Sequence, residues 1–152
     1  MLQVLSACRQ LTWLDARCNR LCHVDAIASL PLLRALWLGG NSLHRLWGGR
    51  VGPSSVQAPF LPHLQLLHLQ GNQDLLSVHQ LTACWRLTSL HLQGAAVQAP
   101  QLLGALRTLR RLRVLRLPAG LNTQACLTAL RVCNKYYVIN NNKNNNNNDN
   151  TF

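Results

Sequence analysis

Carboxylate side chains, which many catalytic sites need, are scarce in this chain of 152 residues. The chain has no glutamate, and its four acidic residues are Asp15, Asp25, Asp74 and Asp149. General acid–base catalysis therefore has few candidate residues. The sequence also lacks the GxSxG nucleophile motif, the phosphate-binding loop and the HExxH zinc motif. We predict that the protein is not an enzyme and needs no cofactor.

Six cysteines are the other candidate reactive groups. They show no CxxC pair, and Cys18-x3-Cys22 is a weak metal signal. Cys8, Cys84 and Cys133 fall where the repeat described below has leucine. We interpret the cysteines as buried, reduced thiols that pack as small apolar residues. This use of cysteine predicts a reducing compartment, cytoplasmic or otherwise intracellular.

Basic residues dominate the charge of the chain, which is +11 at pH 7, and 13 of the 15 basic residues are arginine. Such a surplus attracts acidic protein surfaces and nucleic acid alike. No aromatic residues that could stack on bases cluster with the densest basic run, so nucleic acid is the second choice of partner. A solvated set of positions between leucines explains the run equally simply. The run consists of Arg107, Arg110, Arg111, Arg113 and Arg116.

Leucine recurs at fixed spacing through most of the chain. All 33 leucines lie between Leu2 and Leu130, and residues 33–43 read LxxLxLxxNxL without a mismatch. Further copies begin at Leu11, Leu64, Leu87 and Leu112, so the intervals between copies are 22, 31, 23 and 25 residues. Asparagine stands at the ninth position of three copies, as Asn19, Asn41 and Asn72, and Ala95 and Gly120 replace it in the other two.

Five copies in register make residues 2–133 resemble a leucine-rich repeat protein of the short-repeat class, with repeats of about 22–25 residues. The resemblance implies an α/β solenoid with a parallel β-sheet on the concave face and short helices or turns on the convex face. In each LxL the two leucines point to the same side of a strand, and stacked neighbouring repeats bury them together. A bundle of amphipathic helices would not explain the recurring asparagine.

Helical spacing also appears in the segments that lead from one strand to the next. Asp25 is expected to cap a helix over 26–30, and residues 77–84 have helical spacing. Pro100 is expected at the start of a helix with an apolar stripe, and Thr123 at the cap of a last helix that runs through Ala129. The stripe consists of Leu102, Leu103, Leu106 and Leu109.

We predict a leucine-rich repeat domain over residues 1–139 and a disordered, Asn-rich tail over 140–152. The domain has an exposed Gly- and Pro-rich insertion at 47–60. Cys133, Tyr136 and Val138 continue the leucine spacing, so 136–139 could form the strand of a partial sixth repeat. The pattern starts without a polar capping unit, which suggests a fragment of a larger repeat protein.

Residues that alternate with the strand leucines should point onto the concave face. Concave residues of this kind are the usual protein-binding surface in the family that the chain resembles. Neighbouring histidines in this surface could share a metal ion, but no third ligand stands beside them, so no metal site is predicted. The predicted partner-binding residues are Asp15, Trp37, His68, His91, Arg116, Arg34, Gln65, Arg113 and Arg17.

These observations favour an interaction module that binds a protein partner, acidic in view of the charge, on its concave face. A basic nucleic-acid-binding module is the first alternative. The second is an incomplete fragment without a function of its own. No apolar run approaches the ~20 residues that a membrane-spanning helix needs, so no transmembrane segment is predicted.

Overall fold

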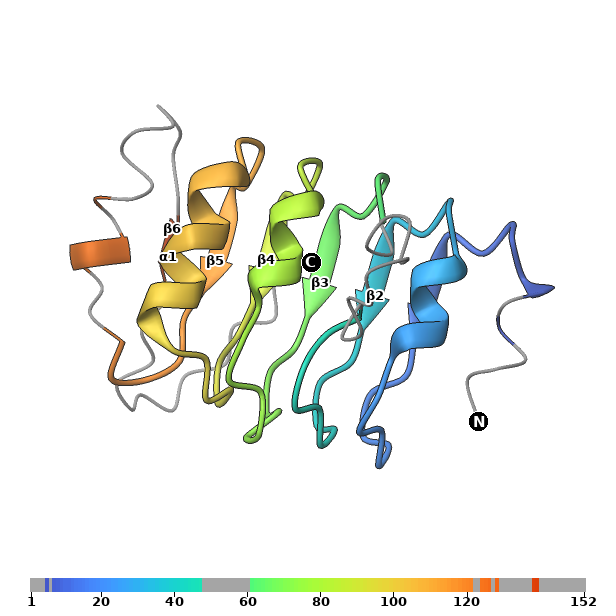
Figure 1. Ribbon diagram of the computed structural model, residues 1–152, viewed down its shortest axis with the longest axis horizontal. Helices are drawn as coiled ribbons and strands as arrows, with labels where there is room; N and C mark the ends of the chain where they lie inside the picture. Colours follow the sequence, from blue (N-terminus) through green and yellow to red (C-terminus); the bar gives the residue numbers. More distant parts are fainter. Residues whose placement is uncertain are drawn as a thin grey trace, which may run out of the picture.

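A computed structural model describes residues 5, 7–47, 61–121, 124–126, 128 and 138–139. Short strands alternate with short helices along these residues (Figure 1). In chain order the elements are β1 (Trp13–Asp15), η2 (Asp25–Ser29), β2 (Ala35–Trp37), β3 (Leu66–His68), η3 (His79–Ala83), β4 (Ser89–His91), α1 (Ala99–Thr108), β5 (Val114–Arg116) and β6 (Val138–Ile139). The elements η2 and η3 are 3-10 helices, and α1 is an α-helix.

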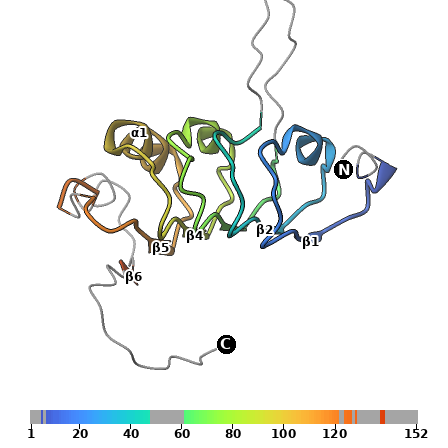
Figure 2. The ribbon, with the colours of Figure 1, turned by 90° about the horizontal axis from the view of Figure 1, so that it is seen from below.

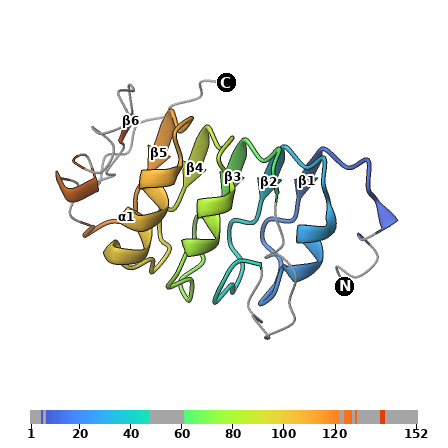
Figure 3. The ribbon, with the colours of Figure 1, turned by 45° about the horizontal axis from the view of Figure 1, so that its top comes forward.

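The strands form one parallel sheet of six, ordered as they occur in the chain. Each strand pairs with the strand of the next repeat, so the strands lie side by side along the molecule (Figures 1 and 3). The middle residues of the first five strands stand in one register. They are Leu14, Leu36, Leu67, Leu90 and Leu115. The predicted leucine-rich repeat solenoid is therefore confirmed.

The helices occupy one side of the sheet, and the core lies between the sheet and these helices (Figure 2). Leu36, Leu67 and Leu90 are completely buried, because strand alternation turns them all toward this interior. From the helical side, Ile27 of η2 and Leu81 of η3 are likewise completely buried. No single repeat encloses its own leucines, so the stack of repeats is the unit that folds.

The connecting segments are helical where the sequence predicted it, but two are 3-10 helices and not α-helices. Asp25 lies in the first turn of η2 and not at its cap, since the capping position is Val24 and makes no side-chain hydrogen bond. A five-residue segment is too short for more than about one turn of either helix, so contact with the sheet decides its form. Pro100 does lie in the first turn of α1, as predicted. Residues 124–126 are helical, but Thr123 and Ala129 lie outside the described residues.

The asparagines join each repeat to the one before it. The Asn72 side-chain amide donates to the carbonyl oxygens of Leu38 and Leu69, at 3.0 and 2.8 Å. Its oxygen accepts from the backbone N–H of Leu43, at 3.2 Å. Asn41 makes the equivalent three bonds one repeat earlier. Each buried asparagine thus satisfies backbone groups of two repeats that water cannot reach.

Ala95 can replace asparagine because the preceding repeat closes differently. Leu75 comes one residue later than the pattern requires, and its N–H donates to the backbone oxygen of Asn72 at 3.2 Å. That N–H consequently needs no side-chain acceptor from the next repeat.

A column of residues with left-handed backbone conformation follows the strands, and the leucine pattern did not predict it. Gly40, Gly71 and Gly94 have φ near +70°, and Cys18 occupies the same place in the first repeat with φ +53°. Replacing Cys18 by glycine should raise the free energy of unfolding by about 0.5–1 kcal/mol, because a Cβ is strained in this conformation. Urea denaturation measures the change. Cys18→Ala is the control, since it keeps the Cβ; an equal gain there would contradict the backbone explanation.

The prediction of buried cysteines is right for Cys84 and Cys126 and wrong for Cys8, Cys18 and Cys22, which are exposed free thiols. Burial raises the pKa of the Cys84 thiol to about 12, so this group stays protonated. Cys8 is exposed because, among the described residues, the first repeat is covered on one side only. Cys133 lies outside the described residues.

Two predicted boundaries differ from those of the structure. Trp47 was assigned to the exposed insertion, but it is 1% exposed and belongs to the core, because this large ring follows Leu46 into the interior. The sixth strand exists, but Ile139 and not Tyr136 pairs with Leu115. The remainder of the insertion, residues 48–60, and the predicted disordered tail, residues 140–152, lie outside the described residues.

Candidate functional site

The sheet has one face turned away from η2, η3 and α1, which we call the open sheet face (Figure 2). The third residue of each of the first five strands points onto it. Strand register places these residues in one row: Asp15, Trp37, His68, His91 and Arg116. This is the row that the sequence predicted as the centre of the binding surface.

A second predicted row runs beside the first, and each of its residues directly precedes a strand. Arg34 donates its N–H to the oxygen of Thr12, Gln65 to that of Arg34, and Arg113 to that of Thr88, each at 2.8 Å. These bonds hold the row together across the repeats. Arg34, Gln65 and Arg113 are exposed. A third row stands two residues after each strand, and its residues differ in exposure. Arg17 is exposed, whereas Gly39 and Pro118, at the equivalent positions, are buried.

Aromatic and imidazole rings form a continuous chain across four strands. The ring centroids of Trp13 and Trp37 are 5.2 Å apart, and those of Trp37 and His68 are 5.6 Å apart. His68 and His91 stack at 3.8 Å with their planes 17° apart. The chain begins at Trp13, which is 54% exposed, and ends at His91, which is 8% exposed. It is thus a pre-assembled aromatic surface open at the β1 end.

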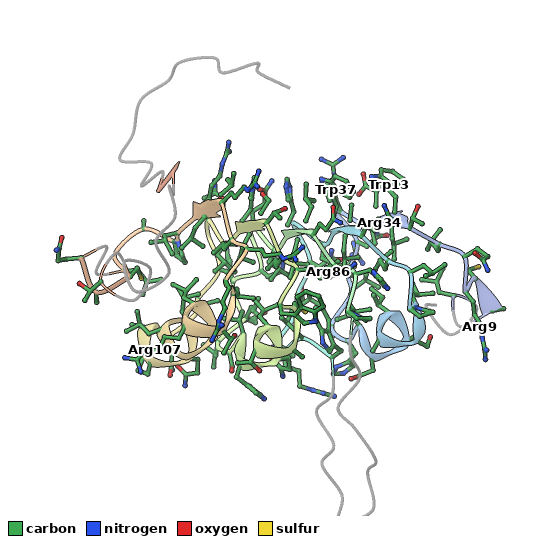
Figure 4. All side chains as sticks on the ribbon, turned by 90° about the horizontal axis from the view of Figure 1, so that it is seen from above. Arg9, Trp13, Arg34, Trp37, Arg86 and Arg107 are labelled. Atoms are coloured by element: carbon green, nitrogen blue, oxygen red, sulfur yellow. The ribbon has the colours of Figure 1, made fainter. Side chains whose placement is uncertain are left out.

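Trp13 was not among the predicted site residues. It is the first residue of β1, two before Asp15, so strand alternation turns it to the same face. The sequence held this signal, because the residue two places after each repeat start should point outward as well. Figure 4 shows Trp13, Trp37 and Arg34 gathered on the side of the sheet away from the helices.

Burial favours the neutral form of both histidines. Burial lowers the pKa of His91 to about 4, and the charges of His68 and Arg116 act in the same direction. Burial, followed by Arg116 and Arg17, lowers the pKa of His68 as well. Nearly parallel rings do not converge their nitrogens on one ion. Within the described residues, no three His, Cys, Asp or Glu side chains could hold a metal together.

The lowered pKa of His91 predicts a loss of stability in acid. The unfolded chain takes up a proton near pH 6.5, whereas the folded protein does so only near pH 4. Stability therefore falls as the pH drops from 6.5 to 4, by at most about 3 kcal/mol for this group. Urea denaturation of the wild type and of His91→Gln between pH 7 and pH 4 measures the difference in slope.

Other groups also titrate in this range, so the comparison needs a matched histidine. His79 is exposed at the start of η3, on the other side of the solenoid. The pH dependence of His91→Gln should be flatter than that of His79→Gln, which removes a histidine outside the chain of rings. Equal pH slopes in the wild type and His91→Gln would contradict the assignment.

Asp15 is the one acidic residue in the central row, and Arg17 neutralises it. Arg17 Nη2 lies 2.7 Å from Asp15 Oδ2, and Arg17 Nε donates to Oδ1 at 3.0 Å. Hydrogen bonds from Arg17 lower the pKa of Asp15. The carboxylate is therefore ionised and paired at neutral pH.

The basic run of residues 107–116 does not form a single patch. Arg113 and Arg116 belong to the sheet side, whereas Arg107 lies in the last turn of α1 on the opposite side (Figure 4). Arg111 belongs to neither side: it lies over the ring of Trp85, with its Cζ 5.3 Å from the ring centroid. A phosphate backbone could not contact all of these side chains at once, which weakens the nucleic-acid alternative.

The contacts around Trp85 were also missed from the sequence. Arg86 Cζ lies 4.8 Å from the Trp85 ring centroid, and Arg86 Nη1 donates to His63 Nδ1 at 3.0 Å. Together with Arg111 these residues link three successive repeats at the turns that precede the strands. Repeat register places His63, Arg86 and Arg111 in one column, one residue before the first leucine of each repeat, but it does not show that the two arginines lie over the Trp85 ring.

Repeated strands in parallel register, buried leucines and asparagine turns give the described part of this chain the fold of a leucine-rich repeat solenoid. No protein-family model matches the chain. A stretch of 90 residues, 58% of the chain, is 39% identical to the human leucine-rich repeat-containing protein 56. The match spans 15% of the length of that relative.

Two solved structures of internalins from Listeria monocytogenes str. 4b F2365 are also similar. The inlF structure has a TM-score of 0.48 and 16% identity, with 90% of this chain and 44% of the internalin covered. The inlC2 structure has a TM-score of 0.35 and 16% identity, with 87% and 74% covered. No helix among the described residues is long and apolar enough to cross a membrane.

Proposed function

We propose that the protein is a non-enzymatic interaction module that binds a protein partner through the open sheet face. The observation that carries this proposal is the chain of rings from Trp13 to His91, part exposed and already assembled on rigid strands. Tryptophan and arginine are the side chains that most often dominate binding energy at protein interfaces. Because the strands hold these side chains in place, binding requires little further ordering.

Removing the two largest predicted anchors should abolish partner binding. We expect Trp37→Ala combined with Arg116→Ala to weaken capture of partners from a cell extract by at least about 100-fold, or roughly 3 kcal/mol. Quantitative mass spectrometry of the captured proteins measures the loss, and circular dichroism checks that the fold persists.

Arg107→Ala is the matched control, since Arg107 is exposed on the opposite side of the solenoid (Figure 4). Partners should be retained by this variant and lost by the double variant. Equal retention by both variants would show that the open sheet face is not the binding surface.

We further propose an intracellular, reducing location. Cys8, Cys18 and Cys22 are exposed free thiols, and exposed thiols persist in a reducing environment.

A further inference from the structure

The open sheet face is chemically different at its two ends. At the β1 and β2 end it presents the rings of Trp13 and Trp37, in contact at 5.2 Å. At the β5 end it presents Arg113 and Arg116, both exposed. The stacked pair His68 and His91 lies between the two ends. A ligand that lies across the strands therefore meets an aromatic surface first and a cationic surface last.

The cationic end has no carboxylate of its own among the described residues. The ion pairs that the described part contains are Arg17–Asp15 and Arg45–Asp25, both from the first two repeats. Arg113 and Arg116 are the arginines of this end that lie on the sheet side, and residues 76–121 include no acidic residue. Like charges held on one rigid surface repel each other, and an anionic ligand removes that repulsion. The positive charge of this end thus favours an acidic ligand.

Resting on the proposed function, we propose that the occupant is an extended acidic peptide segment with an apolar anchor. Its aliphatic or aromatic side chain contacts Trp13 and Trp37, and its carboxylates contact Arg113 and Arg116. Strands lie ~4.8 Å apart, so β1 and β5 are separated by ~19 Å, or about six residues of extended peptide. Anchor and carboxylates should thus stand about four to six residues apart.

Side chains of the open sheet face recognise the peptide, and the peptide does not pair with the sheet as an additional strand. It crosses the strands of the face, whose backbone groups already bond to their neighbours within the sheet. Affinity then comes from the aromatic end, and the choice of charge comes from the arginine end. These two contributions can be separated by substitution.

An unbiased decapeptide library, selected on the full chain in about 50 mM salt, tests the proposal. The wild type should enrich peptides that carry an apolar anchor four to six residues from two or more acidic residues. Arg113→Ser with Arg116→Ser should lose the acidic enrichment and keep the anchor. Trp13→Ser with Trp37→Ser should lose the anchor and keep the acids. One selected peptide, measured by fluorescence anisotropy, should bind at least tenfold more weakly to each double variant.

The outcomes separate this inference from the proposed function. Peptides that need Trp37 but show no acidic enrichment would overturn the inference and leave the proposed function intact. Peptides that bind all variants equally would overturn both. A failure to enrich any peptide overturns the inference, as does a single-stranded oligonucleotide that binds more tightly than the best peptide and depends on Arg113 and Arg116.

Discussion

Replacing Leu90 by aspartate is expected to unfold the protein at neutral pH. Leu90 is completely buried in β4, in register with Leu67 on one side and Leu115 on the other. The buried residues that the structure describes include no arginine or lysine to pair with a new carboxylate. Burying this charge costs at least about 5 kcal/mol, comparable with the ~5–15 kcal/mol that stabilises a typical domain. Far-UV circular dichroism and urea denaturation measure the loss.

The same substitution, of leucine by aspartate, at a strand position on the open sheet face provides the control. Leu66 is in β3 but points onto the open sheet face, where it is partly exposed. Leu66→Asp should lower the free energy of unfolding by about 1 kcal/mol, because its carboxylate stays in contact with water. If both variants melt alike, the buried and open faces of the strands have been assigned wrongly.

The strand positions could be predicted because they follow from geometry alone. A side chain in a strand alternates between two faces, so the leucines at the two ends of each LxL identify the buried face. The residues between them must then point outward, and the row from Asp15 to Arg116 follows directly. Five copies in register leave no freedom to shift this assignment. What these outward residues bind is a separate question, which geometry does not answer.

The sixth strand shows where the same reasoning becomes weak. Leucine spacing predicted that Tyr136 occupies the row of Leu115, but Ile139 does so. Tyr136, Val138 and Ile139 all suit a strand, since β-branched and aromatic residues favour that structure. Apolar spacing with one copy therefore does not determine the register.

Contacts between turns and the electrostatics of the site also lay beyond the sequence. The Trp85 ring meets Arg111 because two turns of neighbouring repeats lie close together, and it meets Arg86 within its own turn. The pKa of His91 depends on how deeply its ring is buried beside His68. Both properties arise from side-chain packing, which residue spacing does not specify.

Replacing Asn72 by alanine should cost about 3 kcal/mol of unfolding free energy, which is large for the loss of one polar side chain. Asn72 is completely buried, and its amide serves the backbone of two repeats. The variant leaves the Leu43 N–H without its side-chain acceptor, and the Leu38 oxygen keeps only the bond from the Asn41 amide. Buried groups without partners lose their hydration and gain nothing in exchange.

Asn19 provides the matched control, because it occupies the same position of the first repeat but is exposed. Its amide donates to the oxygens of Ala16 and Arg17, at 3.1 and 3.0 Å, where water can replace it. Asn19→Ala should therefore cost less than about 1 kcal/mol. Urea denaturation of both variants measures the difference. If the two costs were equal, the propensity of asparagine for turns, and not its link between repeats, would explain why the residue recurs.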